Sequence, residues 1–230
     1  MNLVVAFTAI VAGIFVWWLA VRRLTTRSWE AQGGFDGRDS AELMGVPPQR
    51  LGLWIFLAVV TSFFALFIAA YAIRMSPHAQ DGVLLKDWRP VAEPSILWVN
   101  TALLFLGSLG MQFARRAIGL GQLRRASAGM LAGGAFALAF LAGQLLAWRE
   151  LQAAGYYAAA NPANAFFYVL TALHGLHLLG GLVVLGRTGA RMTRPGAPAG
   201  AVRLGIELCT VYWHYLFVVW LVLFGLLLIT

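Results

Sequence analysis

Leu204 to Ile229 reads LGIELCTVYWHYLFVVWLVLFGLLLI, a run with one formal charge, at Glu207. A helix needs about 20 mostly apolar residues to cross the hydrocarbon core of a membrane, so this run predicts a spanning helix. Five further runs meet the same criterion: Leu3 to Val21, Leu51 to Ile73, Ile96 to Ala114, Ala126 to Trp148 and Ala165 to Leu185. The sequence therefore predicts an all-α integral membrane protein with six transmembrane helices.

The composition of the whole chain agrees with a membrane protein. Of the 230 residues, 60% are hydrophobic and 11% are charged, whereas soluble proteins carry about 25% charged residues. The single cysteine, Cys209, provides neither an intrachain disulfide nor the paired thiolates of a binuclear copper centre. The net charge of +8 comes from bases that flank apolar runs. This placement favours membrane topology over nucleic-acid binding, and no nucleic-acid partner is expected.

Most basic residues lie in the loops after the first, third and fifth predicted spans. Such loops stay on the cytoplasmic side of a membrane, so both termini are expected on the outer side. Residues 25–49 are polar and contain several glycines and prolines, which predicts a cytoplasmic linker between an N-terminal helix, 1–24, and a five-helix bundle, 50–230. The bases concerned are Arg22, Arg23, Arg27, Arg38, Arg50, Arg115, Arg116, Arg124, Arg125, Arg187, Arg191, Arg194 and Arg203.

Polar side chains inside the last two predicted spans form the candidate site. A charge at the centre of a spanning helix costs about 2.5 to 3.5 kcal/mol, so each such residue needs a reason. Residues three or seven positions apart share a helical face, and a rise of about 1.5 Å per residue places His177 and His214 at the same depth. We therefore expect these two histidines to bond directly or through water. The predicted polar cluster consists of Thr171, His174, His177, Glu207 and His214.

Three interpretations of this polar cluster remain open. Neutral histidines can bond between helices and fix their packing, facing histidines can serve as axial haem ligands, and an acid–histidine chain at depth can relay protons. The chain has four histidines, one of them His78 in a predicted outer loop, too few for the ligands of a dinuclear haem-copper core. Glu207 lies near the inner surface, where Arg203 one turn earlier, or water, is expected to reach it.

Two further patterns concern packing and lipid. Small residues let membrane helices approach closely, and we expect this of Gly107, Gly110, Gly129, Gly133, Gly175, Gly180 and Gly181. Bases beside a membrane attract anionic headgroups by about 1 kcal/mol each. The cluster Arg115, Arg116, Arg124 and Arg125 contains no acid and predicts bound anionic phospholipid, with topology alone as the alternative.

The last two spans also carry motifs of a known family. Residues 164–181 read NAFFYVLTALHGLHLLGG and residues 205–221 read GIELCTVYWHYLFVVWL. They resemble, in order and spacing, the Thr before His-Gly-Leu-His and the Gly-x-Glu, Tyr-Trp-His and Val-Val-Trp-Leu elements of cytochrome c oxidase subunit III, a family of the haem-copper terminal oxidases. Weaker matches extend the resemblance over residues 50–230, at Arg50, Gly52, Asn100, Thr101 and Gln144.

This resemblance implies a non-catalytic accessory subunit of an aerobic terminal oxidase, in a bacterial inner membrane. Such a subunit packs against oxidase core subunit I and other oxidase subunits, binds phospholipid and helps to supply protons to the core. Haems and copper would belong to the partner subunits, with no cofactor or metal in this chain, and cytochrome c would meet it only through the complex. Subunit III of a quinol oxidase or of a nitric oxide reductase relative is the alternative. A bis-histidine haem anchor is a different class.

The chain departs from the family pattern where that pattern has membrane carboxylates. Val59 and Val60 stand in place of Ser-Glu, Ala147 in place of the Glu after Gln144, and Phe217 in place of an acid after the Trp-His element. The family also has two helices before the bundle, where this sequence predicts one. We therefore predict that the polar cluster is a packing element and that proton supply is at most a minor role.

Overall fold

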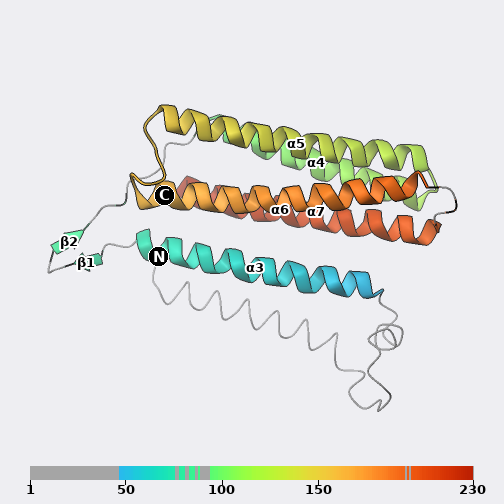
Figure 1. Cartoon of the computed structure of the whole chain (residues 1–230), viewed down its shortest axis with the longest axis horizontal. Coiled ribbons are helices and arrows are strands. Elements are labelled where there is room, and N and C mark those ends of the chain that lie inside the picture. Colours follow the sequence, from blue (N-terminus) through green and yellow to red (C-terminus); the bar gives the residue numbers. More distant parts are fainter. Residues whose placement is uncertain are drawn as a thin grey trace, which may run out of the picture. The chain divides into compact units, whose positions relative to one another are not determined.

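The structure, a computed structural model, describes residues 47–75, 78–80, 83–85, 88, 94–194, 196 and 198–229. Within these residues there are five helices long and apolar enough to cross a membrane, which confirms five of the predicted spans. The first predicted span, Leu3 to Val21, lies outside the described residues, as does the predicted linker up to residue 46. The helices are α3 (Pro48–Met75), α4 (Ile96–Gly119), α5 (Leu123–Ala153), α6 (Pro162–Met192) and α7 (Ala199–Ile229), labelled in Figure 1.

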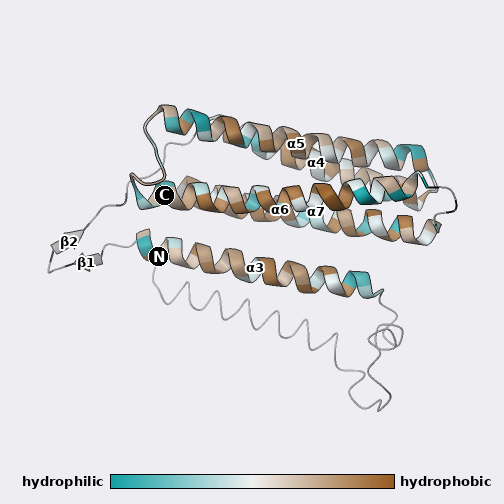
Figure 2. Cartoon of the chain, viewed as in Figure 1, coloured by the Kyte–Doolittle hydropathy of each residue, from teal (hydrophilic) through white to brown (hydrophobic). Residues whose placement is uncertain are grey.

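Each helix extends beyond the apolar run that predicted it. For example, α5 continues past Trp148 through Arg149 and Glu150 to Ala153. Charged residues carry a helix beyond the hydrocarbon core without a desolvation cost, because the ends of a long helix lie in the polar headgroup region. Figure 2 shows hydrophilic residues toward the helix ends and hydrophobic residues along their middles.

The chain divides into two compact units, Met1–Ser76 and Pro77–Thr230. Of the first unit the structure describes α3, whose buried residues are Leu57, Val60, Phe64 and Tyr71. Their spacing of three, four and seven places them on one face of the helix. Most of the remaining surface of α3 is apolar and exposed, as expected for a membrane span.

The second unit contains a small feature that the sequence did not predict. Strands β1 (His78–Gln80) and β2 (Val83–Leu85) pair in antiparallel fashion, with His78 opposite Leu85. Strands of three residues are too short to give a recognisable alternating pattern. The all-α expectation therefore holds for the membrane-length elements, and the described part of the chain adds one hairpin.

Helices α4 to α7 form a four-helix bundle. Helix α4 packs against α5 and α7, and α6 packs against α7 and α5. The connections from α4 to α5 and from α6 to α7 lie at the same end of this bundle (Figure 1). That end carries the bases of the predicted third and fifth loops, so the arrangement gathers them at one side of the membrane.

Two glycines in left-handed conformations end the first two bundle helices. Gly121 has φ 71° and Gly155 has φ 86°. After each, the next amide reaches back to the last turn: Gln122 N–H to Ala117 O at 2.9 Å, and Tyr156 N–H to Leu151 O at 2.9 Å. This is the Schellman arrangement, which satisfies terminal carbonyls and favours glycine because it has no Cβ.

Glycines bring α4 and α5 into close contact, as the sequence predicted. A Cβ added at Gly129 would lie 2.7 Å from Gly110 O, and one added at Gly110 would lie 3.2 Å from Gly129 O. Gly181 similarly receives the ring of Tyr212. The prediction is wrong for Gly180, which has nothing within 4 Å of its Cβ position, because it lies on the exposed side of α6.

Candidate functional site

His214 is held by two polar side chains of α4. Its Nδ1 is hydrogen-bonded to the hydroxyl of Ser108, and its Nε2 lies 3.2 Å from Gln112 Oε1. Because an amide oxygen only accepts, Nε2 carries the proton, and Nδ1 accepts from the Ser108 hydroxyl. Both nitrogens of a neutral imidazole are thus engaged. We call Ser108, Gln112 and His214 the α4–α7 polar triplet.

His177 takes part in different contacts. Its Nδ1–H donates to Leu173 O within α6 at 2.7 Å, and its own carbonyl accepts a hydrogen bond from the Tyr212 hydroxyl at 2.9 Å. Since both nitrogens of His214 bond to α4, the expected direct bond between His214 and His177 is wrong. The physical reason is rotational: His214 and Tyr212 are two residues apart on α7, so they point to different neighbours.

Thr171 joins α6 to α5. Its hydroxyl donates to Phe167 O in its own helix at 2.7 Å and accepts from Trp148 Nε1 at 3.1 Å. The Trp148 ring also packs edge-on against Tyr168, with centroids 5.8 Å apart. Thr171 therefore acts as the acceptor that allows a tryptophan N–H to lie between two membrane helices.

His174 lies in the centre of the bundle, with 0% of its surface exposed. Its ring packs edge-on against Phe140 of α5 at 5.6 Å and lies 5.5 Å from the ring of Trp220 on α7. Neither ring nitrogen has a hydrogen-bond partner among the described residues. The structure thus separates the predicted cluster into distinct environments, with His174 between aromatic rings and His214 against α4.

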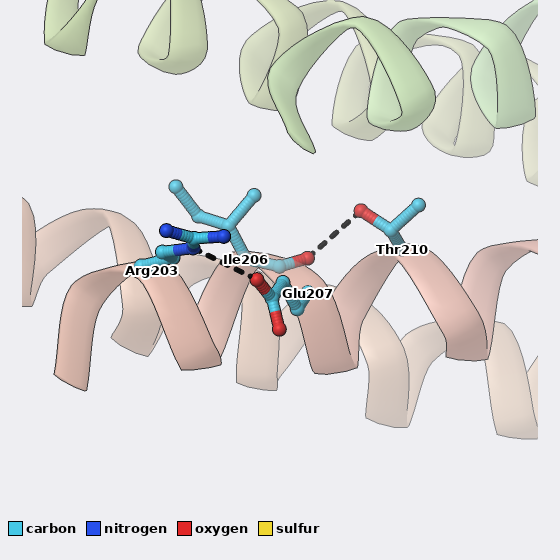
Figure 3. Close-up of polar contacts among 4 residues, drawn as sticks. All are labelled: Arg203, Ile206, Glu207 and Thr210. Atoms are coloured by element: carbon cyan, nitrogen blue, oxygen red, sulfur yellow. Dashed lines mark hydrogen bonds and ion pairs between the residues drawn. The ribbon is translucent and has the colours of Figure 1, made fainter. Parts of the chain in front are cut away.

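Glu207 makes the contact expected from the sequence. Its Oε1 lies 3.0 Å from Arg203 Nε, one turn earlier on α7, and Figure 3 shows the two side chains pointing toward one another. The next turn carries Thr210, whose hydroxyl lies 2.8 Å from Ile206 O and 3.2 Å from Met111 O on α4. The acidic group of α7 is therefore paired along its own helix, whereas Thr210 links that helix to α4.

The positions where the family pattern has acids are occupied by packed apolar residues. Val60 is 4% exposed and Ala147 is 0% exposed. The ring of Phe217 lies 5.8 Å from the ring of Phe105 on α4. Val60 and Ala147 are thus buried, and Phe217 makes an aromatic contact between α7 and α4.

The four arginines near the α4–α5 turn are exposed. They lie on both sides of Gly121, and Arg125 Nη1 donates to Gln122 Oε1 at 2.9 Å. Exposure leaves guanidinium groups able to reach phosphate oxygens, which they recognise through two parallel hydrogen bonds. The arrangement of Arg115, Arg116, Arg124 and Arg125 thus suits anionic headgroups.

The described residues contain no group of three or more His, Cys, Asp or Glu side chains that could hold a metal ion. A bis-histidine haem also fits poorly at His214, because a ligand to iron needs a free lone pair and Ser108 engages the one on Nδ1. The hydrogen bonds of Ser108, Gln112 and His214 fix α4 and α7 relative to one another.

Sequence reasoning missed several of the residues that bind this cluster together. Ser108 and Gln112 are four residues apart on α4 and share a face, which was a usable signal. Single serines and glutamines in apolar runs are common enough that this signal alone does not name a partner. Trp148 and Tyr212 were missed because their polar atoms are small parts of large rings.

Comparison with known proteins finds one family that matches almost the whole chain. The family model described as "Cytochrome c oxidase subunit III" matches residues 1–229. The chain belongs to the cytochrome c oxidase subunit III family. It is 30% identical over 180 residues to "Cytochrome c oxidase subunit 3" of Thermostichus vulcanus, a match that covers 77% of this chain and 85% of the relative.

Other members of the family extend the range of relatives. "Cytochrome c oxidase subunit 3" of Triticum aestivum is 29% identical over 218 residues, covering 92% of this chain and 76% of the relative. "Cytochrome bo(3) ubiquinol oxidase subunit 3" of Buchnera aphidicola is 27% identical over 173 residues, covering 75% and 82%. Relatives of this chain therefore carry names that refer to two different electron donors.

Proposed function

We propose that this chain is the non-catalytic accessory subunit III of an aerobic haem-copper terminal oxidase that oxidises cytochrome c and reduces oxygen. The observation that carries the proposal is the family match over residues 1–229. In this role the chain stabilises core subunit I and contacts other oxidase subunits, while haems and copper reside in those partners. Cytochrome c is proposed as the donor because the relatives from Thermostichus and Triticum are named for it.

A quinol is the second candidate donor, favoured by the relative named as a ubiquinol oxidase subunit. Affinity purification through a tag on this chain, from its native membranes, tests both proposals. We expect the core subunit to copurify, with haem absorption and oxygen consumption driven by reduced cytochrome c. Oxygen consumption driven only by a quinol would show that a quinol is the donor in place of cytochrome c. Recovery of this chain without a haem-copper core would overturn the accessory role.

We propose that the polar cluster serves packing, with proton supply at most a minor role. Glu207 is paired with Arg203, His214 is engaged by α4, and apolar residues replace the acids of the family pattern. A chain of proton carriers needs successive groups within reach of one another, and one carboxylate near the helix end does not provide this.

The experiment compares Glu207→Gln with Glu150→Gln, a control at the opposite end of the bundle. Both variants remove one carboxylate and keep the size of the side chain. We expect each to retain nearly full oxygen turnover and proton uptake in the intact complex across a range of pH. A several-fold loss of proton uptake confined to Glu207→Gln, with normal assembly, would show that this carboxylate handles protons.

The finer topology is also a proposal. Six spans, with residues 1–24 as the first, 25–49 as a cytoplasmic linker and 50–230 as a five-helix bundle, place both termini on the outer side. The common basic end of α4 to α7 supports this direction. Single cysteines at the two ends of the Cys209→Ser chain, tested with a membrane-impermeant thiol reagent in sealed vesicles, should react from the outer side; reaction from the inner side contradicts the topology.

We propose a bacterial inner membrane as the location and anionic phospholipid as a ligand of the α4–α5 turn. The first proposal rests on the six apolar runs together with the oxidase family, and cell fractionation tests it. The second rests on four exposed arginines around one turn, each of which attracts an anionic headgroup by about 1 kcal/mol.

A further inference from the structure

Five buried side chains within α4 to α7 carry polar atoms without a described hydrogen-bond partner: Asn100, Gln144, Asn164, His174 and Trp213. Asn100, Gln144 and His174 are 0%, 3% and 0% exposed. Asn100 Nδ2 donates to Gln144 Oε1 at 3.3 Å. Asn100 Oδ1, Gln144 Nε2 and both nitrogens of His174 have no hydrogen-bond partner among the described residues. Buried polar groups almost always find a partner, in the protein or in ordered water.

Aromatic contacts place these side chains in one layer of the bundle. Trp220 packs edge-on against Phe140 at 4.8 Å and lies 5.5 Å from the ring of His174. The same indole donates its N–H to Thr101 Oγ1 at 2.9 Å, and Thr101 follows Asn100 in α4. Trp220 of α7 therefore contacts His174 directly and reaches the level of the two amides through Thr101, which is next to Asn100, and Phe140, which is one turn from Gln144.

The chemistry of the unpaired atoms selects the ligand. Gln144 Nε2 is a donor, Asn100 Oδ1 is an acceptor, and a neutral imidazole offers one of each. The N–H groups of Gln144 would repel a cation, and the Asn100 oxygen would repel an anion, so neither kind of ion suits both amides. Water both donates and accepts, and a buried water typically makes about three hydrogen bonds to otherwise unsatisfied groups.

We propose that Asn100, Gln144 and His174 form a binding site for ordered water inside the bundle. Water donates to Asn100 Oδ1, accepts from Gln144 Nε2, and connects this amide pair to His174, for which no other polar partner is described. The site concerns the core of this chain and is independent of the proposed oxidase role. It would make the centre of the bundle polar and hydrated.

The direct test is a cryo-electron microscopy map of the intact complex at a resolution that shows ordered waters. We expect at least one peak within hydrogen-bonding distance of Asn100 Oδ1 and Gln144 Nε2, and contact from the same peak or a second one to a nitrogen of His174. Well-defined side chains with no peak between them would overturn the proposal. This test uses the unaltered protein and does not depend on any variant folding.

A thermal test uses the double variant Asn100→Leu with Gln144→Met, which keeps side-chain size and removes both amides. In a core without water, this change removes the unpaired amide atoms together with the single hydrogen bond between the two amides. The midpoint temperature for heat-induced loss of the subunit should then stay the same or rise. In a hydrated core the change removes the water's partners and strands His174, so the midpoint should fall. A midpoint that stays or rises contradicts the proposal.

A control compares how the effects of variants at His174 and at the two amides add. His174→Leu combined with the double variant should shift the midpoint by less than the sum of the separate shifts, because both changes disrupt the same water. His174→Leu combined with Asn164→Leu should be additive. Asn164 is also buried and its Oδ1 also lacks a described partner, but it lies ten residues before His174, near the start of α6, where its Nδ2 donates to Tyr157 O. Equal additivity in both combinations would argue against a shared water.

Discussion

Replacing Gly129 by alanine should force α4 and α5 apart. The new Cβ would lie 2.7 Å from Gly110 O, 2.8 Å from Ala114 N and 2.9 Å from Ala114 Cβ. Contacts between heavy atoms are favourable near 3.5 to 4.0 Å, so the two helices must separate by roughly 1 Å. The atoms in the way are backbone atoms or a Cβ, and neither can move without its helix.

The net effect is the difference between two opposing terms. Overpacking a well-packed core costs about 1–3 kcal/mol, and glycine to alanine in a helix contributes about 0.5–1 kcal/mol of stability. We therefore expect a net loss of about 1–2 kcal/mol for Gly129→Ala. Separated helices would also weaken the contacts that depend on this close approach, including Met111 against Gly133.

Gly180 and Gly186 in α6 are the matched controls. Neither has any atom within 4 Å of its Cβ position, so alanine at either position should leave stability unchanged or slightly raised. The assay follows heat-induced loss of the subunit from the intact complex, with oxygen consumption as a check on assembly. A midpoint for Gly129→Ala equal to that of Gly180→Ala would refute the close approach of α4 and α5.

The remaining predictions follow from the contacts already described. His214→Leu should weaken retention of the subunit by about 1–3 kcal/mol, because it strands Ser108 and Gln112 in the bundle; unchanged retention in detergent washes would contradict this. Changing all four arginines of the α4–α5 turn to glutamine should lower the anionic phospholipid that copurifies, and lipid analysis showing equal amounts would leave them a role in topology alone. The isolated chain should show no haem absorption and no stoichiometric copper, and metal that is lost on mutating His177 or His214 would favour the haem-anchor alternative.

Contacts within a single helix could be predicted from spacing. Arg203 and Glu207 are four residues apart on one face of α7, and the structure pairs them at 3.0 Å. The five described spans could also be predicted, because the length of an apolar run is a property of the local sequence. The pairing of strands β1 and β2 could not be predicted, because three-residue strands are too short to show an alternating pattern.

Contacts between helices depended on rotations that spacing does not determine. Depth placed His177 and His214 level, but depth says nothing about the direction in which each side chain points around its helix. In the structure α7 directs Tyr212 toward α6 and His214 toward α4. Both Gly129 and Gly180 were expected at helix interfaces. The same uncertainty about rotation explains why the expectation was correct for Gly129 and wrong for Gly180.

The sequence by itself determined the membrane class, the five described spans, the family and the pairing of Glu207 with Arg203, since each depends on residue type and distance along one chain. Tertiary structure alone decided which helix His214 meets and that His174 lies among aromatic rings without a described polar partner. These outcomes depend on how four helices rotate against one another. That rotation follows from the summed packing of glycines and large side chains over the whole interface, which no local pattern contains.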